Sequence, residues 1–127
     1  MVAITIDLNN KTIFPKSQKA SDWAESPKII GKRSGYTVLM WDLDAPACTR
    51  TGENWLHMLY NDDEFFYQGP CPPDKSHRYI IAQFPSKKIT FNWKYGCVLT
   101  PEPRKSSIMV LIDKPKSNEE CGGLVKR

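Results

Sequence analysis

The sequence contains no apolar run that approaches the ~20 residues needed for a membrane-spanning helix. Its first residues also lack the basic segment followed by an apolar stretch that marks a secretory signal. We therefore expect neither a transmembrane segment nor a secretory leader. No internal repeat, low-complexity segment or sustained helical periodicity is present, which excludes repeat proteins and argues against a mainly helical fold.

Cysteine and histidine are scarce. The chain has 4 cysteines, none of them in a Cys-x-x-Cys pair, and 2 histidines. Because the spacings of these residues fit no zinc pattern, we expect no metal at Cys48, His57, Cys71 and His77, and no other cofactor. We expect the cysteines to be free thiols in a reduced, cytoplasmic protein.

Charge of either sign is moderate. The formal net charge is +4 at pH 7, and the lysines and arginines are scattered along the chain. A balance of this size fits an acidic ligand but is too weak to indicate a nucleic-acid partner. We therefore expect a small anionic ligand and no binding to nucleic acid.

Proline, in contrast, is abundant, with 10 residues among 127. Proline ends helices and separates short strands, so the sequence predicts an all-β fold, an antiparallel β-sandwich with few short helical turns. We expect one domain over residues 1–113. The tail over 114–127 is rich in Lys, Ser, Asn, Glu and Gly, and we expect it to be mobile.

The clearest strand covers residues 36–41, which are apolar on both faces, as expected of a central strand. One helical turn is predicted over 21–25. The other strands are predicted over residues 2–6, 12–14, 28–30, 55–60, 65–67, 78–84, 89–93, 96–99 and 107–112.

Three clusters of residues that could bind a ligand or take part in catalysis lie at the ends of predicted strands. The first is Asp42-Leu43-Asp44-Ala45-Pro46, the second is Trp55-Leu56-His57, and the third is Gly69-Pro70-Cys71-Pro72-Pro73 followed by His77-Arg78-Tyr79. Residues two apart on a strand share a face, so each histidine lies beside an aromatic side chain. We expect both histidines to line one pocket.

An aspartate beside a histidine favours the imidazolium and determines which ring nitrogen carries the proton. The remaining nitrogens then offer hydrogen-bond donors to an incoming anion. A proline-rich loop supplies rigid walls and backbone N–H groups that are left for a ligand. The pattern predicts an anion pocket with apolar walls and a polar floor.

In this order, the three clusters resemble the hallmarks of the phosphatidylethanolamine-binding protein family. The resemblance covers roughly residues 26–84 and implies a β-sandwich with a small anion pocket at one end. It implies that Asp42, His57, His77 and Tyr79 contact a phosphate-type group, together with a backbone N–H near Cys71. It also implies a cis bond between Ala45 and Pro46.

By the same resemblance, we expect a non-catalytic binding protein, not an enzyme. Its ligand would be a phosphate-type anion, a phospholipid headgroup or a phosphorylated group, and it would regulate signalling partners such as kinases. The short chain has no room for the C-terminal helix of animal members. Its size is closer to bacterial members or to those of large DNA viruses, which would place a viral member in the host cytoplasm.

The sequence departs from the family pattern at two places. Leu43 replaces the proline of the aspartate box, and only three residues separate Pro73 from His77, where the family loop is longer and contains glycine. Within that short connection, Lys75 either adds positive charge at the pocket mouth or fills part of it.

The predicted ligand-binding residues come from the three clusters. Asp44 is one of them, although the alternative for Asp44 is a structural role in which it bonds turn amides or Arg78. Two other functions stay open: an interaction protein that kept the sandwich but lost the pocket, and a small phosphoester hydrolase, for which no nucleophile is evident. The candidate residues are Asp42, Asp44, Pro46, Trp55, His57, Gly69, Cys71, Pro73, His77 and Tyr79.

Overall fold

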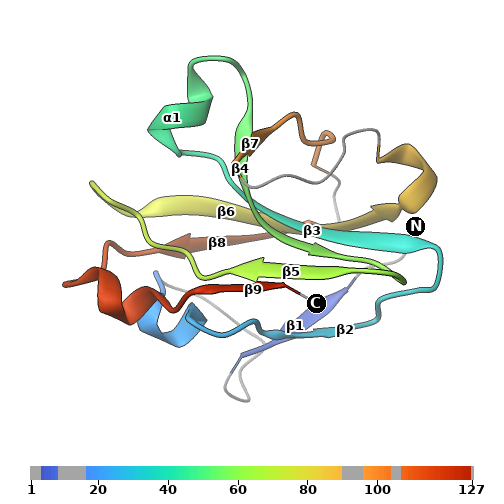
Figure 1. The fold of residues 1–127 in the computed structure, drawn as a ribbon, viewed down its shortest axis with the longest axis horizontal. Coiled ribbons are helices and arrows are strands. Elements are labelled where there is room, and N and C mark those ends of the chain that lie inside the picture. Colours follow the sequence, from blue (N-terminus) through green and yellow to red (C-terminus); the bar gives the residue numbers. More distant parts are fainter. Residues whose placement is uncertain (1–3, 9–16, 90–95, 104–106, 127) are drawn as a thin grey trace.

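The computed structural model describes residues 4–8, 17–89, 96–103 and 107–126. These residues form two antiparallel sheets (Figure 1). The large sheet has the order β8–β6–β3–β4–β5–β9, with β7 paired to β4, and the small sheet is β1–β2. The strands β1 to β9 are Thr5–Asp7, Lys28–Ile30, Tyr36–Asp42, Asn54–Tyr60, Phe65–Gln68, His77–Pro85, Cys97–Val98, Ile108–Ile112 and Leu124–Lys126.

The helical elements are short. They are η1 (Ala20–Trp23), α1 (Pro46–Thr49), η2 (Ser86–Lys88) and η3 (Asn118–Cys121). The predicted all-β fold with few short helical turns is therefore confirmed. None of the helices in the described part of the chain has the length and apolar character that a membrane crossing requires.

Strand β3 lies at the centre of the large sheet, between β4 and β6. Its residues from Thr37 to Asp42 are all buried, which agrees with the two-sided apolar pattern of the sequence. At the end of this strand, Asp42 lies opposite Trp55 on β4 and opposite Tyr79 on β6. Three predicted site residues are thereby brought together by strand pairing alone.

Two hydrophobic clusters cover the two faces of the large sheet. The cluster toward β1–β2 includes the buried side chains of Ile6, Trp23, Met40, Met58, Tyr79 and Ile112. The cluster on the opposite face includes Leu39, Trp41, Leu56, Phe84 and Val98. Since burial of a large apolar side chain contributes about 1.5–3 kcal/mol, these two layers stabilise the framework that carries the site.

Some predicted elements differ from the structure. The predicted strand 12–14 lies outside the described residues, and so does most of the predicted strand 89–93. The bond between Ala45 and Pro46 is trans, since no described peptide bond is cis, so the implied cis bond is wrong. Pro46 instead occupies the first turn of α1, a position where the missing N–H of proline is tolerated and its fixed φ suits the helix.

The predicted mobile tail over 114–127 is largely incorporated into the fold. Strand β9 pairs with β5, with Leu124 opposite Gln68 and Val125 opposite Tyr67. The polar composition of the tail gives no sign of this strand, because all three of its residues are exposed. The strand forms through backbone pairing with β5 rather than through an apolar face.

The cysteines form two disulfides, Cys48–Cys97 and Cys71–Cys121. The prediction of four free thiols is therefore wrong. The first disulfide joins α1 to β7, and the second joins the proline-rich loop to η3. Disulfides persist in oxidising compartments, so the cysteines no longer support the predicted reducing location.

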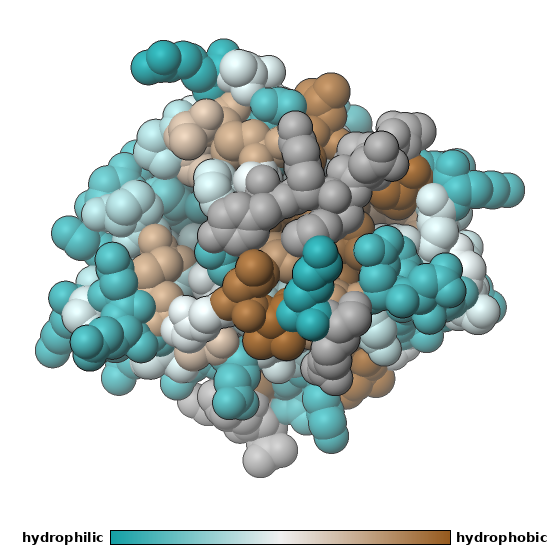
Figure 2. Space-filling model, viewed as in Figure 1, coloured by the Kyte–Doolittle hydropathy of each residue, from teal (hydrophilic) through white to brown (hydrophobic). Residues whose placement is uncertain are grey.

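Strand β9 is also one edge of the large sheet. Figure 2 shows apolar side chains gathered on the face that carries β5 and β9 in Figure 1. Leu124 and Val125 of β9 are exposed by 51% and 43%. This edge leaves two apolar side chains in contact with solvent, next to the charged Lys126.

Candidate functional site

A pocket of about 260 Å³ lies where strands β3, β4 and β6 end near α1. It gathers nine of the ten residues predicted from the sequence, and Asp44 is the exception. The nine are Asp42, Pro46, Trp55, His57, Gly69, Cys71, Pro73, His77 and Tyr79, and the lining is completed by Ala45, Ala47 and Gln68.

A β-bulge brings His57 into the pocket. Met40 pairs with Met58, whereas the next residue, Trp41, pairs with Leu56, so His57 is the extra residue on β4. A bulge of this kind changes the direction of a side chain and is frequent beside functional sites. It lets His57 and Met58, although adjacent in sequence, contribute to the same side of the sheet as Asp42.

His57 is buried, and its Nδ1 lies 2.9 Å from the backbone oxygen of Gln68. A carbonyl oxygen accepts hydrogen bonds, so Nδ1 carries the proton and Nε2 is the nitrogen left for a ligand. Burial lowers the pKa of His57, and the bond to Gln68 and the charge of Asp42 oppose this effect without reversing it. His57 is therefore neutral at pH 7.

His77 is completely buried and lies between two carboxylates. Its Nδ1 is 2.7 Å from Oδ2 of Asp42, and its Nε2 is 2.7 Å from Oδ1 of Asp74. Burial alone would lower the pKa of His77, but the hydrogen bonds and charges of Asp42 and Asp74 outweigh burial and raise it. The pKa values of the two histidines in this pocket are thus shifted in opposite directions.

Tyr79 is completely buried, and its hydroxyl makes no hydrogen bond of acceptable geometry to any described residue. Its ring packs edge-on against His57, with 5.3 Å between the ring centroids. Burial, together with the negative charge of Asp42, raises the pKa of Tyr79, so the phenol stays protonated. A buried hydroxyl without a partner in a pocket wall is a donor available to a ligand.

Asp44 is turned away from the pocket toward Arg78. Its carboxylate accepts hydrogen bonds from the backbone N–H of Arg78 at 2.9 Å, from Nε at 3.0 Å and from Nη2 at 2.7 Å. These contacts lower the pKa of Asp44 to about 2. Of the two roles considered for Asp44, the structure shows the contact with Arg78.

Gln68 supports the pocket wall and was not identified from the sequence. Its side-chain oxygen accepts a hydrogen bond from Nε1 of Trp55 at 3.1 Å, while its backbone oxygen binds His57. The next residue, Gly69, packs so closely on Cys121 that a β-carbon there would overlap the backbone oxygen of Cys121. The C-terminal segment therefore holds the wall that orients His57.

The short connection after Pro73 also differs from expectation. Lys75 is exposed and does not line the pocket, so it neither fills the pocket nor contributes charge inside it. The residue that reaches His77 is instead Asp74, which no sequence pattern singled out. The backbone path that brings Asp74 to His77 depends on the length of this loop.

Chemically, the hydroxyl of Tyr79 and, once protonated, Nε2 of His57 are donors that the pocket offers to an anion. Among the residues that the structure describes, neither lysine nor arginine lines the pocket. Cys48 and Cys71 are in disulfides and do not serve as thiolate ligands. Among the described residues, no group of three or more His, Cys, Asp and Glu side chains is arranged to hold a metal ion.

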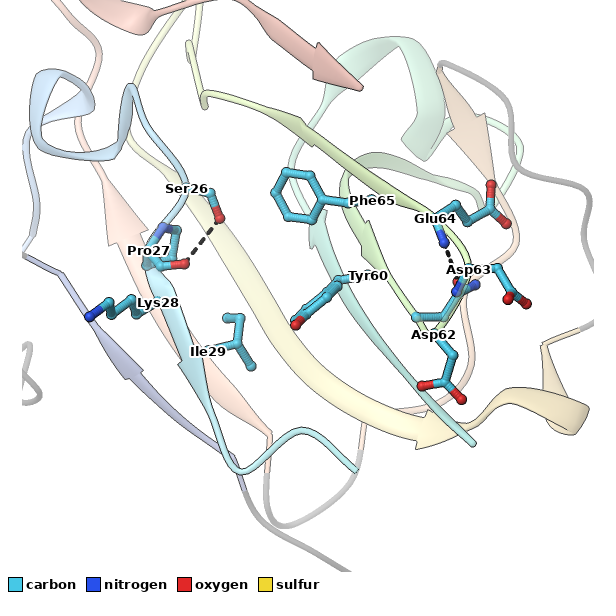
Figure 3. Close-up of a pocket in the computed structure, with 10 residues that line it drawn as sticks. Ser26, Pro27, Lys28, Ile29, Tyr60, Asp62, Asp63, Glu64 and Phe65 are labelled. Carbon is cyan, nitrogen blue, oxygen red and sulfur yellow. Dashed lines mark hydrogen bonds between the residues drawn. The ribbon is translucent and has the colours of Figure 1, made fainter. Parts of the chain in front are cut away.

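A wider hollow of about 560 Å³ lies between β2 and the turn that joins β4 to β5 (Figure 3). Ile29, Tyr60 and Phe65 form its apolar part, and Asp62 and Glu64 belong to its acidic rim. Asp62 is already bound to Lys32 at 2.8 Å. The hollow has no buried polar group aimed into it, so the smaller pocket with the two histidines is the candidate site.

Comparison with known proteins identifies one partial likeness. A UPF0098 protein of Chlamydia pneumoniae is 29% identical over 79 residues, a match that covers 44% of this chain and 53% of that protein. The chain thus spans about half the length of the curated relative it matches. No family model matches the chain, and no solved structure matches it significantly. The functional argument therefore rests on the pocket.

Proposed function

We propose that the protein is a non-catalytic binding module that holds a phosphate-type anion in the pocket formed by Asp42, His57, His77 and Tyr79. The observation that carries this proposal is the buried, unpartnered hydroxyl of Tyr79, whose ring packs against the ring of His57 in the same pocket. A buried donor without a partner costs about 1–3 kcal/mol, and a tetrahedral oxyanion offers the acceptors that this donor lacks. We also propose, on the three clusters that meet here, membership of the phosphatidylethanolamine-binding protein family.

The residues in the pocket support binding rather than catalysis. Cys71 is held in a disulfide, and no serine or threonine lies among the described residues that line the pocket. A hydrolase would need a nucleophile or a base that activates water. His57 is neutral and can accept a proton, but Tyr79 stays protonated, and the described lining supplies no serine, threonine or free cysteine as a nucleophile.

Anion binding is expected to be coupled to proton uptake. The pocket contains the carboxylate of Asp42, a neutral His57 and an imidazolium at His77 that is already paired. An incoming anion therefore finds a donor at Nε2 of His57 only when this ring gains a proton. The charge of the ligand stabilises that proton, so the pKa of His57 rises on binding.

Calorimetry tests the proposal, with three probes that separate free from lipid-borne phosphate: inorganic phosphate, phosphoethanolamine, and vesicles of phosphatidylethanolamine compared with phosphatidylcholine. The wild type at about pH 6 is compared with His57→Asn, whose amide keeps a donor near the position of Nδ1 but lacks Nε2. Glu64→Gln, an exposed residue of the wider hollow, is the control.

We expect the wild type and Glu64→Gln to bind the phosphate probes with equal affinity, and His57→Asn to lose at least roughly tenfold. Binding to phosphatidylethanolamine vesicles alone would identify a lipid headgroup as the ligand. If the wild type binds neither free phosphate nor vesicles, the proposal is wrong.

A further inference from the structure

His77 donates both of its ring protons to protein carboxylates. Nδ1 lies 2.7 Å from Asp42, which is buried, and Nε2 lies 2.7 Å from Asp74, whose side chain is 49% exposed. Carboxylates only accept hydrogen bonds, so both nitrogens are donors and the ring is an imidazolium. One of its two partners belongs to the pocket floor, while the other faces solvent.

The short loop places Asp74 at this position. Pro73 lines the pocket and Asp74 follows it directly, and the carboxylate of Asp74 reaches Nε2 of His77, which is another lining residue. Oδ1 of Asp74 also accepts a hydrogen bond from the backbone N–H of Lys75 at 2.9 Å. Farther along, the hydroxyl of Ser76 binds Asp113 at 2.6 Å, which anchors the far side of the loop.

The charges at this end of the pocket disfavour an anion. Asp42 and Asp74 contribute two negative charges around the single imidazolium of His77, and in the described part of the chain no lysine or arginine lines the pocket to balance them. A phosphate near Nε2 would face the carboxylate of Asp74 at close range. Like charges in such a site repel strongly, so the two anions exclude each other at this nitrogen.

We infer that the carboxylate of Asp74 occupies the position at Nε2 of His77 that a phosphate-type anion takes when it binds, and so acts as an internal competitor. This inference rests on the proposed function of the pocket. Asp74 is able to leave because its side chain is half exposed and a rotamer change carries the carboxylate into water. His77 then offers a charge-assisted hydrogen bond to the ligand instead.

The competing explanation is that Asp74 only stabilises the loop. Two variants separate these roles. Asp74→Asn keeps the side-chain shape and an oxygen acceptor but removes the charge, while Asp74→Ala removes the acceptor as well and frees Nε2. Asp63→Asn, at an exposed aspartate in the wider hollow, makes the same change in net charge and is the matched control.

Inorganic phosphate is titrated calorimetrically into the wild type and the three variants at about pH 6, with thermal unfolding recorded in parallel. We expect Asp74→Ala to bind phosphate roughly tenfold or more tightly than the wild type, Asp74→Asn to lie between them, and Asp63→Asn to match the wild type. A purely structural role would instead leave or weaken the affinity while lowering the melting temperature.

If the wild type binds phosphate and Asp74→Ala binds it equally or more weakly, the inference is overturned and the proposed function is left intact. Binding by Asp74→Ala but not by the wild type supports the inference, because the competitor then blocks the native pocket, and it overturns the proposed function of the native protein. No binding by any of the four proteins overturns the proposed function, and the inference with it.

Discussion

Nδ1 of His77 lies 2.7 Å from Oδ2 of Asp42, and the two side chains are almost completely buried. This pair joins the end of the central strand β3 to the start of β6. It also places a cation–anion pair at the pocket floor, so His57 is the histidine left to gain a proton when an anion binds. The predictions below follow from this asymmetry.

The two histidines should titrate on opposite sides of the usual histidine pKa of about 6.5. Burial lowers the pKa of His57, whereas for His77 the carboxylates of Asp42 and Asp74 overcome burial and raise it. Nitrogen-detected NMR of the imidazole rings measures both values directly, because the chain has only 2 histidines. His57→Asn removes one signal and so assigns the other. Two curves that coincide near 6.5 would contradict the described hydrogen bonds.

The same shifts predict how the free energy of unfolding changes with pH. Because the pKa of His77 is raised in the folded protein, its contribution is complete below the unfolded value and is lost as pH rises through the folded value. Chemical denaturation should therefore show stability falling on the alkaline side, and His77→Ala should flatten this decline. An unchanged alkaline slope in His77→Ala would refute the pairing.

Affinity for an anion should increase as pH falls, because binding requires a proton on His57. Sulfate is the suitable probe, since it stays a dianion across the range in which phosphate itself titrates. Calorimetry between about pH 8 and pH 5 should show the affinity rising by at most about tenfold per pH unit, the limit for uptake of one proton. The dependence should become weaker in His57→Asn, in which His77 is the remaining histidine of the pocket. An affinity that is independent of pH, or that rises with pH, would show that His57 carries no such proton.

Asp44→Asn should lower stability without weakening anion binding. Asp44 accepts three hydrogen bonds from Arg78 and lies outside the pocket. Its pKa falls from 3.8 to about 2 in the folded protein, so its contribution is present above the higher value and lost as pH falls through the lower one. Since Arg78 is more than half exposed, we expect a loss of only about 1 kcal/mol in urea denaturation at pH 7. Reduced sulfate affinity in this variant would place Asp44 in the site after all.

Gly69→Ala should disturb the packing of the pocket wall on the C-terminal segment. A β-carbon at this position would overlap the backbone of Cys121, whereas one at Gly123 would meet nothing within 4 Å. We expect Gly69→Ala to lower the free energy of unfolding by about 2 kcal/mol, and Gly123→Ala to change it by less than about 0.5 kcal/mol. Equal stability of the two variants would show that the C-terminal segment does not pack on the pocket wall as described.

Much of the framework could be predicted from the sequence. The two-sided apolar pattern of 36–41 identified the central strand, and the period of two placed His77 and Tyr79 on one face. Asp42 followed from its position at the strand end. In each case, the observed burial and strand pairing follow a regular pattern that is visible in the local sequence.

The remaining features depend on distant parts of the chain. Four cysteines allow three pairings, and partners 49 and 50 positions apart leave no local pattern. Strand β9 consists of three exposed residues and forms through pairing with β5. Asp74 reaches His77 because of the path of a three-residue connection, which neither composition nor periodicity describes.

The most direct measurement compares the wild type with Tyr79→Phe, by phosphoethanolamine calorimetry at about pH 6 and by urea denaturation. The hydroxyl of Tyr79 is buried without a hydrogen-bond partner among the described residues, so its removal should leave the protein equally stable or more stable by about 1 kcal/mol. The affinity should nevertheless fall by roughly tenfold, because the ligand loses a donor. Unchanged affinity, or a marked loss of stability, would contradict the claim that this hydroxyl has no protein partner and donates a hydrogen bond to the bound anion.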